Sequence, residues 1–171
     1  VGGGYIAVEF AGIFNGLGAH TTQLYRGPLF LRGFDADIRA HAAREIANSG
    51  VDLRFEVNVE SIRPGATGLQ VELTDGTALQ ADAVLYATGR KAHLDGLGLA
   101  NVQVVVSEQG AIEVDAQYRT SEPSIFALGD VTGGIVLIPV ALAEGMAFAR
   151  CNFGSLQQHV EKNSAGGELR Q

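Results

Sequence analysis

Three consecutive glycines near the start of this chain constrain its fold more than any other feature. The segment Gly2-Gly3-Gly4-Tyr5-Ile6-Ala7 fits the pattern Gly-x-Gly-x-x-Ala. Glycines at this spacing let the backbone turn tightly from a strand into a helix, and the helix N-terminus then presents free N–H groups to a phosphate. The turn therefore predicts a Rossmann-like α/β fold that binds a dinucleotide through its pyrophosphate.

The residues after this turn indicate which dinucleotide is bound. A carboxylate about twenty residues on holds the ribose of NAD, whereas arginines there hold the 2′-phosphate of NADP. This chain has no Asp or Glu between Phe10 and Phe34, but it has Arg26 and Arg32. Two charge-assisted bonds of about 1.5–3 kcal/mol each would favour NADPH over NADH by about 10² or more. The pattern predicts an NADP site, and the alternative is a pair of solvated surface arginines.

Composition limits the other function classes. The 171 residues carry a net charge of −7, which argues against nucleic acid as a partner. No apolar run is long enough for a membrane span, and the four histidines have no metal-ligand spacing. The one cysteine, Cys151, lies in a predicted helix and is expected to be an ordinary buried thiol. We expect a cytoplasmic location, with an organelle left open.

Periodicity predicts alternating helices and strands in the first half of the chain. Asp35 is a plausible N-cap for the second helix, and Thr74-Asp75-Gly76 supplies a hairpin turn inside an antiparallel three-stranded meander. The expected elements are a helix over 5–16, a strand over 21–25, a helix through about Asn48, a strand over 51–55, the meander over 57–79 and a buried parallel strand over 83–87.

The second half reads as a different domain. Short strands are expected over 102–106, 111–114 and 124–128, and Pro139 is expected to begin a helix that runs to about Arg150. We therefore predict an NADP-binding domain over 1–91 with a truncated first strand, because only Val1 precedes the glycines. A second domain follows over 92–153, and a polar, disordered tail over 154–171.

Six motifs follow one another along the chain. They are residues 1–12, Leu-Arg-Gly-Phe-Asp at 31–35, Ala-Thr-Gly-Arg at 87–90, Arg-Thr at 119–120, Ile-Phe-Ala-Leu-Gly-Asp at 125–130 and Leu-Ile-Pro-Val-Ala at 137–141. In this order they resemble the flavin-dependent disulfide reductases, and among them the glutathione reductase branch. The match is colinear from Val1 to about Phe153, and the order and spacing of the motifs make it specific.

The resemblance implies two cofactors, NADP and FAD, and it makes residues 92–153 part of an FAD-binding domain. It also implies a role for each matching residue. Tyr5 would cover the nicotinamide pocket, and Glu9 would pair with a lysine beside the flavin that lies outside this chain. Asp130 would accept a hydrogen bond from the flavin ribitol, and Ile138 stands where the family has threonine. The implied NADP residues are Gly2, Gly3, Gly4, Tyr5, Ile6, Glu9, Arg26, Arg32, Gly89 and Arg90, although Arg90 could equally form a surface salt bridge.

The resemblance also implies an activity for the parent protein. Hydride would pass from NADPH to FAD, and electrons would then pass through a cysteine pair to a disulfide, with glutathione disulfide preferred and trypanothione or another small disulfide left open. The parent would be a homodimer. The cysteine pair and the acid–base histidine have no counterpart here, so this chain contains no catalytic residue and is expected to be inactive alone. The alternatives are a non-catalytic NADP-binding module and an inactive fragment.

Overall fold

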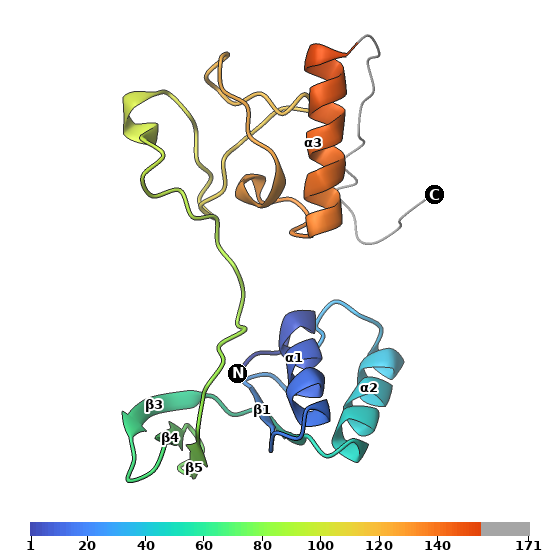
Figure 1. Ribbon diagram of the computed structural model, residues 1–171, viewed down its shortest axis with the longest axis vertical. Coiled ribbons are helices and arrows are strands. Elements are labelled where there is room, and N and C mark those ends of the chain that lie inside the picture. Colours follow the sequence, from blue (N-terminus) through green and yellow to red (C-terminus); the bar gives the residue numbers. More distant parts are fainter. Residues whose placement is uncertain (155–171) are drawn as a thin grey trace. The chain divides into compact units, whose positions relative to one another are not determined.

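The computed structural model describes residues 1–154 and divides the chain into two compact units, Val1–Gly89 and Arg90–Gln171 (Figure 1). The first unit combines two helices with one parallel and one antiparallel sheet. This arrangement confirms the predicted α/β class with its three-stranded antiparallel meander. The tail expected over 154–171 lies outside the described residues, except for Gly154.

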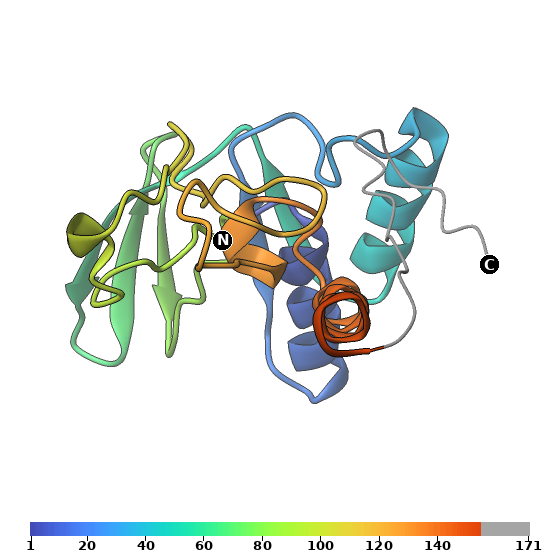
Figure 2. The same ribbon diagram turned by 90° about the horizontal axis from the view of Figure 1, so that it is seen from above.

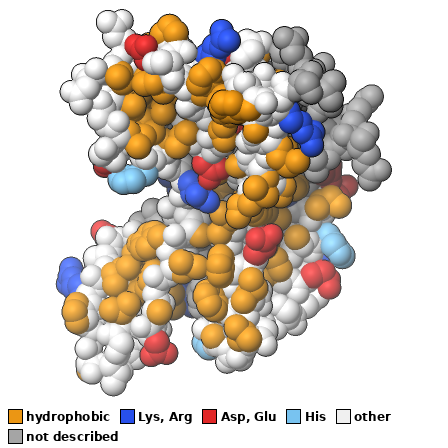
Figure 3. Space-filling model, turned by 45° about the horizontal axis from the view of Figure 1, so that its top comes forward, with side chains coloured by type: hydrophobic (Ala, Val, Ile, Leu, Met, Phe, Trp, Pro, Cys, Tyr) orange, Lys and Arg blue, Asp and Glu red, His pale blue; other side chains and the backbone are white. Residues whose placement is uncertain are grey.

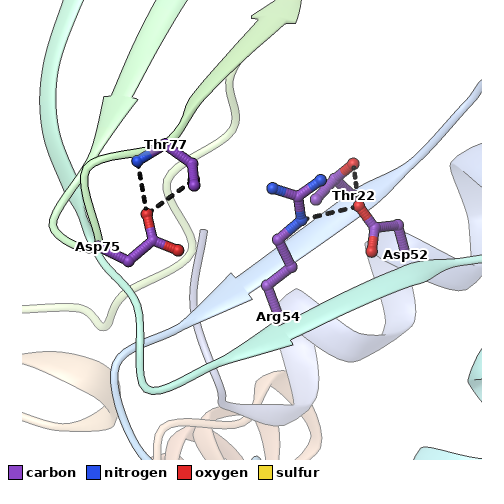
Figure 4. Close-up of polar contacts among 5 residues, drawn as sticks. All are labelled: Thr22, Asp52, Arg54, Asp75 and Thr77. Carbon is purple, nitrogen blue, oxygen red and sulfur yellow. Dashed lines mark hydrogen bonds and ion pairs between the residues drawn. The ribbon is translucent and has the colours of Figure 1, made fainter.

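A small parallel sheet forms the centre of the first unit. Strands β1 (Thr22–Tyr25) and β2 (Asp52–Phe55) pair in parallel, in register from one end to the other. Asp52 accepts hydrogen bonds from the Thr22 hydroxyl at 3.2 Å and from Arg54 Nε at 2.9 Å (Figure 4). On the other side of β1, the Gly2 N–H donates to the Leu24 carbonyl at 2.9 Å. The chain start thus lies directly against β1.

Two helices have the bounds that the sequence predicts. Helix α1 (Tyr5–Gly16) buries Ala7 and Ala11, whose small side chains allow close packing. Helix α2 (Ala36–Asn48) is capped by Asp35, whose Oδ1 accepts from the N–H groups of Asp37 at 2.9 Å and Ile38 at 3.3 Å. The predicted N-cap is therefore confirmed, and it fixes the point where the chain leaves the loop after β1.

The meander forms a second sheet in the order β3-β4-β5 (Figure 2). Its strands are β3 (Val59–Pro64), β4 (Leu69–Leu73) and β5 (Ala78–Ala81), all antiparallel. In the turn before β5, Asp75 accepts from the backbone N–H of Thr77 at 2.9 Å and from its hydroxyl at 2.7 Å (Figure 4). These bonds lower the pKa of the Asp75 carboxyl. The main core joins both sheets through Leu24, Val57, Val71 and Leu73.

The expectation of a buried strand over 83–87 is wrong. The segment makes two ladder bonds, from the Val1 amino group to the Leu85 carbonyl at 2.7 Å and from the Ala87 N–H to the Val1 carbonyl at 2.8 Å. A single paired residue is too short a ladder to define a strand, and Leu85 and Tyr86 remain 46% and 53% exposed. The space-filling view in Figure 3 shows many apolar side chains at the surface. Phe10 and Ile13 of α1, and Leu17 directly after it, are among the exposed large hydrophobic residues.

The second unit is built from loops packed on one helix. It contains two short 3₁₀ helices, η1 (Leu99–Asn101) and η2 (Gly129–Thr132), and the long helix α3 (Ile138–Phe153), whose start near Pro139 was predicted. The strands expected over 102–106, 111–114 and 124–128 are reduced to isolated bridges, Val106 with Ile112 and Arg119 with Phe126. Apolar runs need neighbouring strands to become a sheet, and the described residues supply single pairings here.

The expectation that Cys151 is buried is also wrong. The thiol is exposed and forms no disulfide. Residues 150–153 at the end of α3 are all exposed, because the loops of this unit cover the middle of the helix, where Glu144 and Ala147 are buried. Within residues 1–154, no helix is long and apolar enough to cross a membrane, and no group of three or more potential metal ligands occurs.

Candidate functional site

The three glycines meet three different environments in the folded turn. A Cβ on Gly2 would collide with the carbonyl oxygen of Ala87, and its φ of +141° is unfavourable for other residues. A Cβ on Gly3 would enter the ring of Tyr25. Around Gly4, in contrast, no atom lies within 4 Å of the position that a Cβ would take. Packing therefore explains the first two glycines, whereas the open space at Gly4 is what an approaching ligand requires.

Gly4 is also the N-cap of α1, and no side chain caps this helix end. The first N–H groups of a helix have no partner within the helix, and the helix dipole makes this end positive. Gly4 itself is exposed, and Ile6 is half-buried. The turn thus offers free backbone donors beside an unobstructed approach, which fits the pyrophosphate of a dinucleotide.

The loop that carries Arg26 and Arg32 is bonded directly to this turn. The Leu31 N–H donates to the Gly3 carbonyl at 2.7 Å, and Leu31 has a left-handed φ of 57°. Both arginine side chains are exposed, and within residues 1–154 neither makes a hydrogen bond or an ion pair. The structure therefore brings the loop to the glycine turn and leaves both guanidinium groups available to an anion.

The middle of this loop is held by residues that the sequence analysis did not identify. Phe30 is fully buried, and its ring meets that of Phe55 edge-on with centroids 5.5 Å apart. Arg39 of α2 donates from Nε to the Phe30 carbonyl at 2.8 Å and from Nη2 to the Leu29 carbonyl at 2.5 Å. One signal could have indicated Arg39: it lies near a helix N-terminus, where the dipole disfavours a cation.

Tyr5 and Glu9 lie four residues apart on α1, so they share one face of the helix. Tyr5 is 42% exposed. Glu9 is exposed too, and it makes no ion pair within the described part of the chain. The residues of α1 that pack inward are Ala7 and Ala11. Both candidate side chains can therefore reach a ligand.

Gly89 and Arg90 fall on the two sides of the boundary between units. Gly89 is the exposed last residue of the first unit. Arg90 belongs to the second unit, where its Nη2 lies 3.1 Å from Oδ2 of Asp130. This ion pair joins a residue assigned to the NADP site with the one assigned to the flavin. The assignment of Arg90 to NADP stays a prediction, and the surface salt bridge considered as its alternative is present.

Asp130 lies on a turn that a buried carboxyl group holds. It is the second residue of η2, and Oε2 of Glu144 in α3 accepts from the Gly129 N–H at 2.7 Å. Glu144 is 5% exposed, so it contributes a polar anchor inside the second unit. Burial raises the pKa of the neighbouring Tyr118 hydroxyl, and the charge of Glu144 raises it further. The sequence analysis missed Glu144 because nothing local marks it.

Ile138 lies at the first position of α3, after an N-cap without a side-chain hydrogen bond. Its side chain is 77% exposed and has no hydroxyl group. Pro139 has no N–H group, and the Val140 N–H donates to the Leu137 carbonyl at 3.1 Å, so the Ile138 N–H is the backbone donor of the first turn that remains available to a ligand. The second unit therefore offers Asp130 and the start of α3 as its polar features for a flavin.

Comparisons with known proteins agree with this geometry. The family model of the pyridine nucleotide-disulphide oxidoreductases matches residues 1–145. A glutathione reductase of Burkholderia cepacia is 53% identical over 154 residues, which are 90% of this chain and 34% of that protein. A trypanothione reductase of Trypanosoma congolense is 41% identical over 159 residues, covering 91% of this chain and 32% of the relative.

Solved structures of related oxidoreductases are also similar to this chain. The HOCl-induced flavoprotein disulfide reductase RclA from Escherichia coli has a TM-score of 0.86 and 34% identity over 93% of this chain and 36% of its own. An engineered water-forming NADPH oxidase bound to NADPH has a TM-score of 0.77 and 29% identity, over 85% and 34%. Its substitutions include aspartate to alanine, alanine to arginine and proline to arginine.

The fold and the glycine turn define a Rossmann-like dinucleotide-binding protein. The match over residues 1–145 shows the family: the chain belongs to the pyridine nucleotide-disulphide oxidoreductases. It spans about a third of the length of the relatives that it matches. A flavoprotein and an NADPH-bound oxidase among the matching structures agree with the predicted cofactors FAD and NADP.

Proposed function

We propose that this chain is the NADPH-binding region, with part of the FAD-binding region, of a flavin-dependent disulfide reductase. The observation that carries the proposal is the bond from Leu31 to the Gly3 carbonyl, which attaches a loop with two unpaired arginines to the glycine turn. In NADPH, the 2′-phosphate and the pyrophosphate are two anionic groups on one adenosine. The chain offers a donor set for each.

Each element has a distinct role in this proposal. The N–H groups after Gly4 bind the pyrophosphate, while Arg26 and Arg32 bind the 2′-phosphate by charge-assisted hydrogen bonds. Tyr5, Ile6, Glu9, Gly89 and Arg90 line the rest of the nucleotide site, and Gly2 and Gly3 give the turn its shape. In the second unit, Asp130 holds the ribitol and the backbone at Ile138 faces the flavin. When both cofactors are bound, NADPH supplies a hydride to FAD.

The engineered oxidase supports the choice of NADPH over NADH. That NADPH-bound protein carries an aspartate-to-alanine substitution together with two introduced arginines. This chain likewise lacks an acidic residue between Phe10 and Phe34 and has two arginines there. A carboxylate in this position would repel the phosphate, and guanidinium groups attract it.

Glutathione disulfide is the proposed substrate of the whole protein, because a glutathione reductase has 53% identity to this chain. Trypanothione is the alternative, supported by a trypanothione reductase with 41% identity. The proposed whole protein is a homodimer, as the family resemblance implies. Cys151 is the one cysteine among the 171 residues, so a cysteine pair must come from elsewhere in that protein. This single cysteine also supports a second candidate, an NADP-binding module without disulfide chemistry.

The test compares the two nicotinamide cofactors in the full-length protein. Arg26→Ala combined with Arg32→Ala removes two charge-assisted bonds, so the preference for NADPH over NADH should fall by about 10² or more. Arg44→Ala is the matched control, since Arg44 is an exposed arginine of α2. An unchanged ratio of kcat/KM values in the double variant would refute the proposed site. Reduction of glutathione disulfide against trypanothione disulfide decides the substrate.

A further inference from the structure

Arg39 makes two hydrogen bonds that neither the predicted site nor the fold of α2 requires. Its Nε and Nη2 donate to the carbonyls of Phe30 and Leu29 at 2.8 and 2.5 Å, and both bonds are partly buried. The residue lies four positions after the N-cap Asp35, at the end of a helix where a cation is disfavoured. A guanidinium group in this place must be stabilised by its contacts, and these are with the loop.

The two carbonyls lie in the middle of the loop that separates Arg26 from Arg32. Leu29 and Phe30 are followed at once by Leu31, whose left-handed backbone is unfavourable for a leucine. Leu31 donates to Gly3 at 2.7 Å. One short stretch of backbone is therefore fastened to α2 on one side and to the glycine turn on the other. The side chains of the predicted phosphate ligands Arg26 and Arg32 are not held in this way, since both are exposed and without partners in the described chain.

We propose that Arg39 is a positioning residue for recognition of the adenosine 2′-phosphate. It fixes the loop backbone so that Arg26 and Arg32 present their guanidinium groups beside the glycine turn, and it does not bind the phosphate itself. This inference rests on the proposed use of NADPH. It adds a residue from a different element, whose effect passes through the other two arginines.

A positioning role predicts different effects on the binding of NADPH and of NADH. NADH lacks the 2′-phosphate but has the same pyrophosphate, which binds at the N–H groups after Gly4. Arg39 makes its side-chain bonds to the loop and not to that turn. Loss of Arg39 should therefore raise KM for NADPH, leave KM for NADH unchanged and leave kcat within about twofold, since binding and not the chemical step is altered.

The experiment uses Arg39→Lys and Arg39→Gln in the full-length protein, with Arg44→Lys and Arg44→Gln as matched controls on the same helix. Lysine keeps the charge but lacks the planar fork that serves two carbonyls at once. We expect Arg39→Lys to lower the NADPH-over-NADH preference about tenfold through KM, which corresponds to about 1.4 kcal/mol. The affinity for 2′,5′-ADP, measured by titration calorimetry, should fall by the same factor, and that for 5′-AMP should stay constant.

A combined variant separates positioning from direct binding. In the background of Arg26→Ala and Arg32→Ala, Arg39→Lys should have no further effect on 2′,5′-ADP, because nothing remains to be positioned. A further loss would assign Arg39 to the phosphate itself and overturn the proposal. Equal losses for 2′,5′-ADP and 5′-AMP would also overturn it, since they indicate general destabilisation. The ratio of the two affinities stays informative for a variant of reduced Tm, because both ligands probe the same folded fraction.

These measurements distinguish failure of the role proposed for Arg39 from failure of the proposed function. If the unsubstituted protein binds 2′,5′-ADP no better than 5′-AMP, the assignment of NADPH fails. If it prefers 2′,5′-ADP and the double alanine variant loses that preference, while Arg39→Lys keeps it, the role of Arg39 alone is refuted.

Discussion

Replacement of Glu144 by alanine should weaken flavin binding, although Glu144 is not itself a predicted flavin ligand. Its Oε2 accepts the Gly129 N–H at 2.7 Å, and Asp130 is the next residue along the chain. Glu144 is 5% exposed and the bond is partly buried, so water replaces the lost acceptor only in part. An unsatisfied buried N–H costs about 1–3 kcal/mol, which is the upper bound for the half-buried Gly129. The Gly129–Asp130 turn would be released, and Asp130 would no longer be held in one orientation.

The magnitude follows from how much of this cost appears in FAD binding. If all of it does, the dissociation constant of FAD rises by about 5- to 150-fold. Glu144→Gln retains an oxygen acceptor of the same length, so its effect should stay below about tenfold. Glu108→Ala is the control, since Glu108 is an exposed carboxylate of the same unit.

The assay is titration of the flavin-free full-length protein with FAD, followed by flavin fluorescence, together with the FAD content of the purified protein. Tight FAD binding by the alanine variant would refute the reasoning, because it would show that the turn does not need its anchor. A loss in Glu144→Gln as large as in Glu144→Ala would refute it differently, since the charge and not the acceptor would then be essential.

Two further predictions concern the glycine turn and the buried tyrosine. Gly4→Ala should change the free energy of unfolding by less than about 1 kcal/mol, because the new Cβ meets open space. It should nevertheless raise KM for NADPH, because the Cβ obstructs the phosphate. Gly2→Ala should lower Tm much more, because of the φ of Gly2 and the collision with Ala87. Equal effects of the two substitutions on Tm would contradict this difference. Burial raises the pKa of Tyr118, so the folded state retains this proton above the ordinary tyrosine pKa of about 10, and stability is lost as pH rises from that value through the higher folded one. Thermal unfolding between about pH 9 and 11 should show a steeper alkaline decline for the unsubstituted protein than for Tyr118→Phe.

The sequence predicts those parts of the fold that local chemistry determines. Helix α1 begins after Gly4, where the glycine turn ends. Helix α2 begins after Asp35, because the side chain of this aspartate caps it. The hairpin turn at Asp75 is set in the same way by its bonds to Thr77. These signals lie within a few residues of the feature that they predict, so a single sequence is enough to find them.

The errors concern features that depend on distant partners. The apolar runs at 83–87 and 124–128 were expected to be strands, but strand formation requires a neighbouring ladder that the described residues do not supply. The helical position of Cys151 did not reveal that the end of α3 is uncovered.

In the candidate site, Arg26 and Arg32 followed from a known spacing after the glycine turn. Arg39 and Glu144 did not, because their partners are backbone groups that only the folded chain brings to them. A side chain that bonds to backbone leaves no sequence pattern at its partner, since any residue can supply a carbonyl or an N–H group.

The loop after β1 separates backbone geometry from ligand chemistry. Arg39 binds the carbonyls of Leu29 and Phe30, and the Gly3 carbonyl accepts the Leu31 N–H, whereas the side chains at positions 26 and 32 take no part in holding the loop. Substitution at these two positions can therefore change the charge offered to a nucleotide without disturbing the course of the chain. Evolution or design can therefore alter the cofactor preference of such a protein by changing the codons for these two residues, while the surrounding fold stays the same.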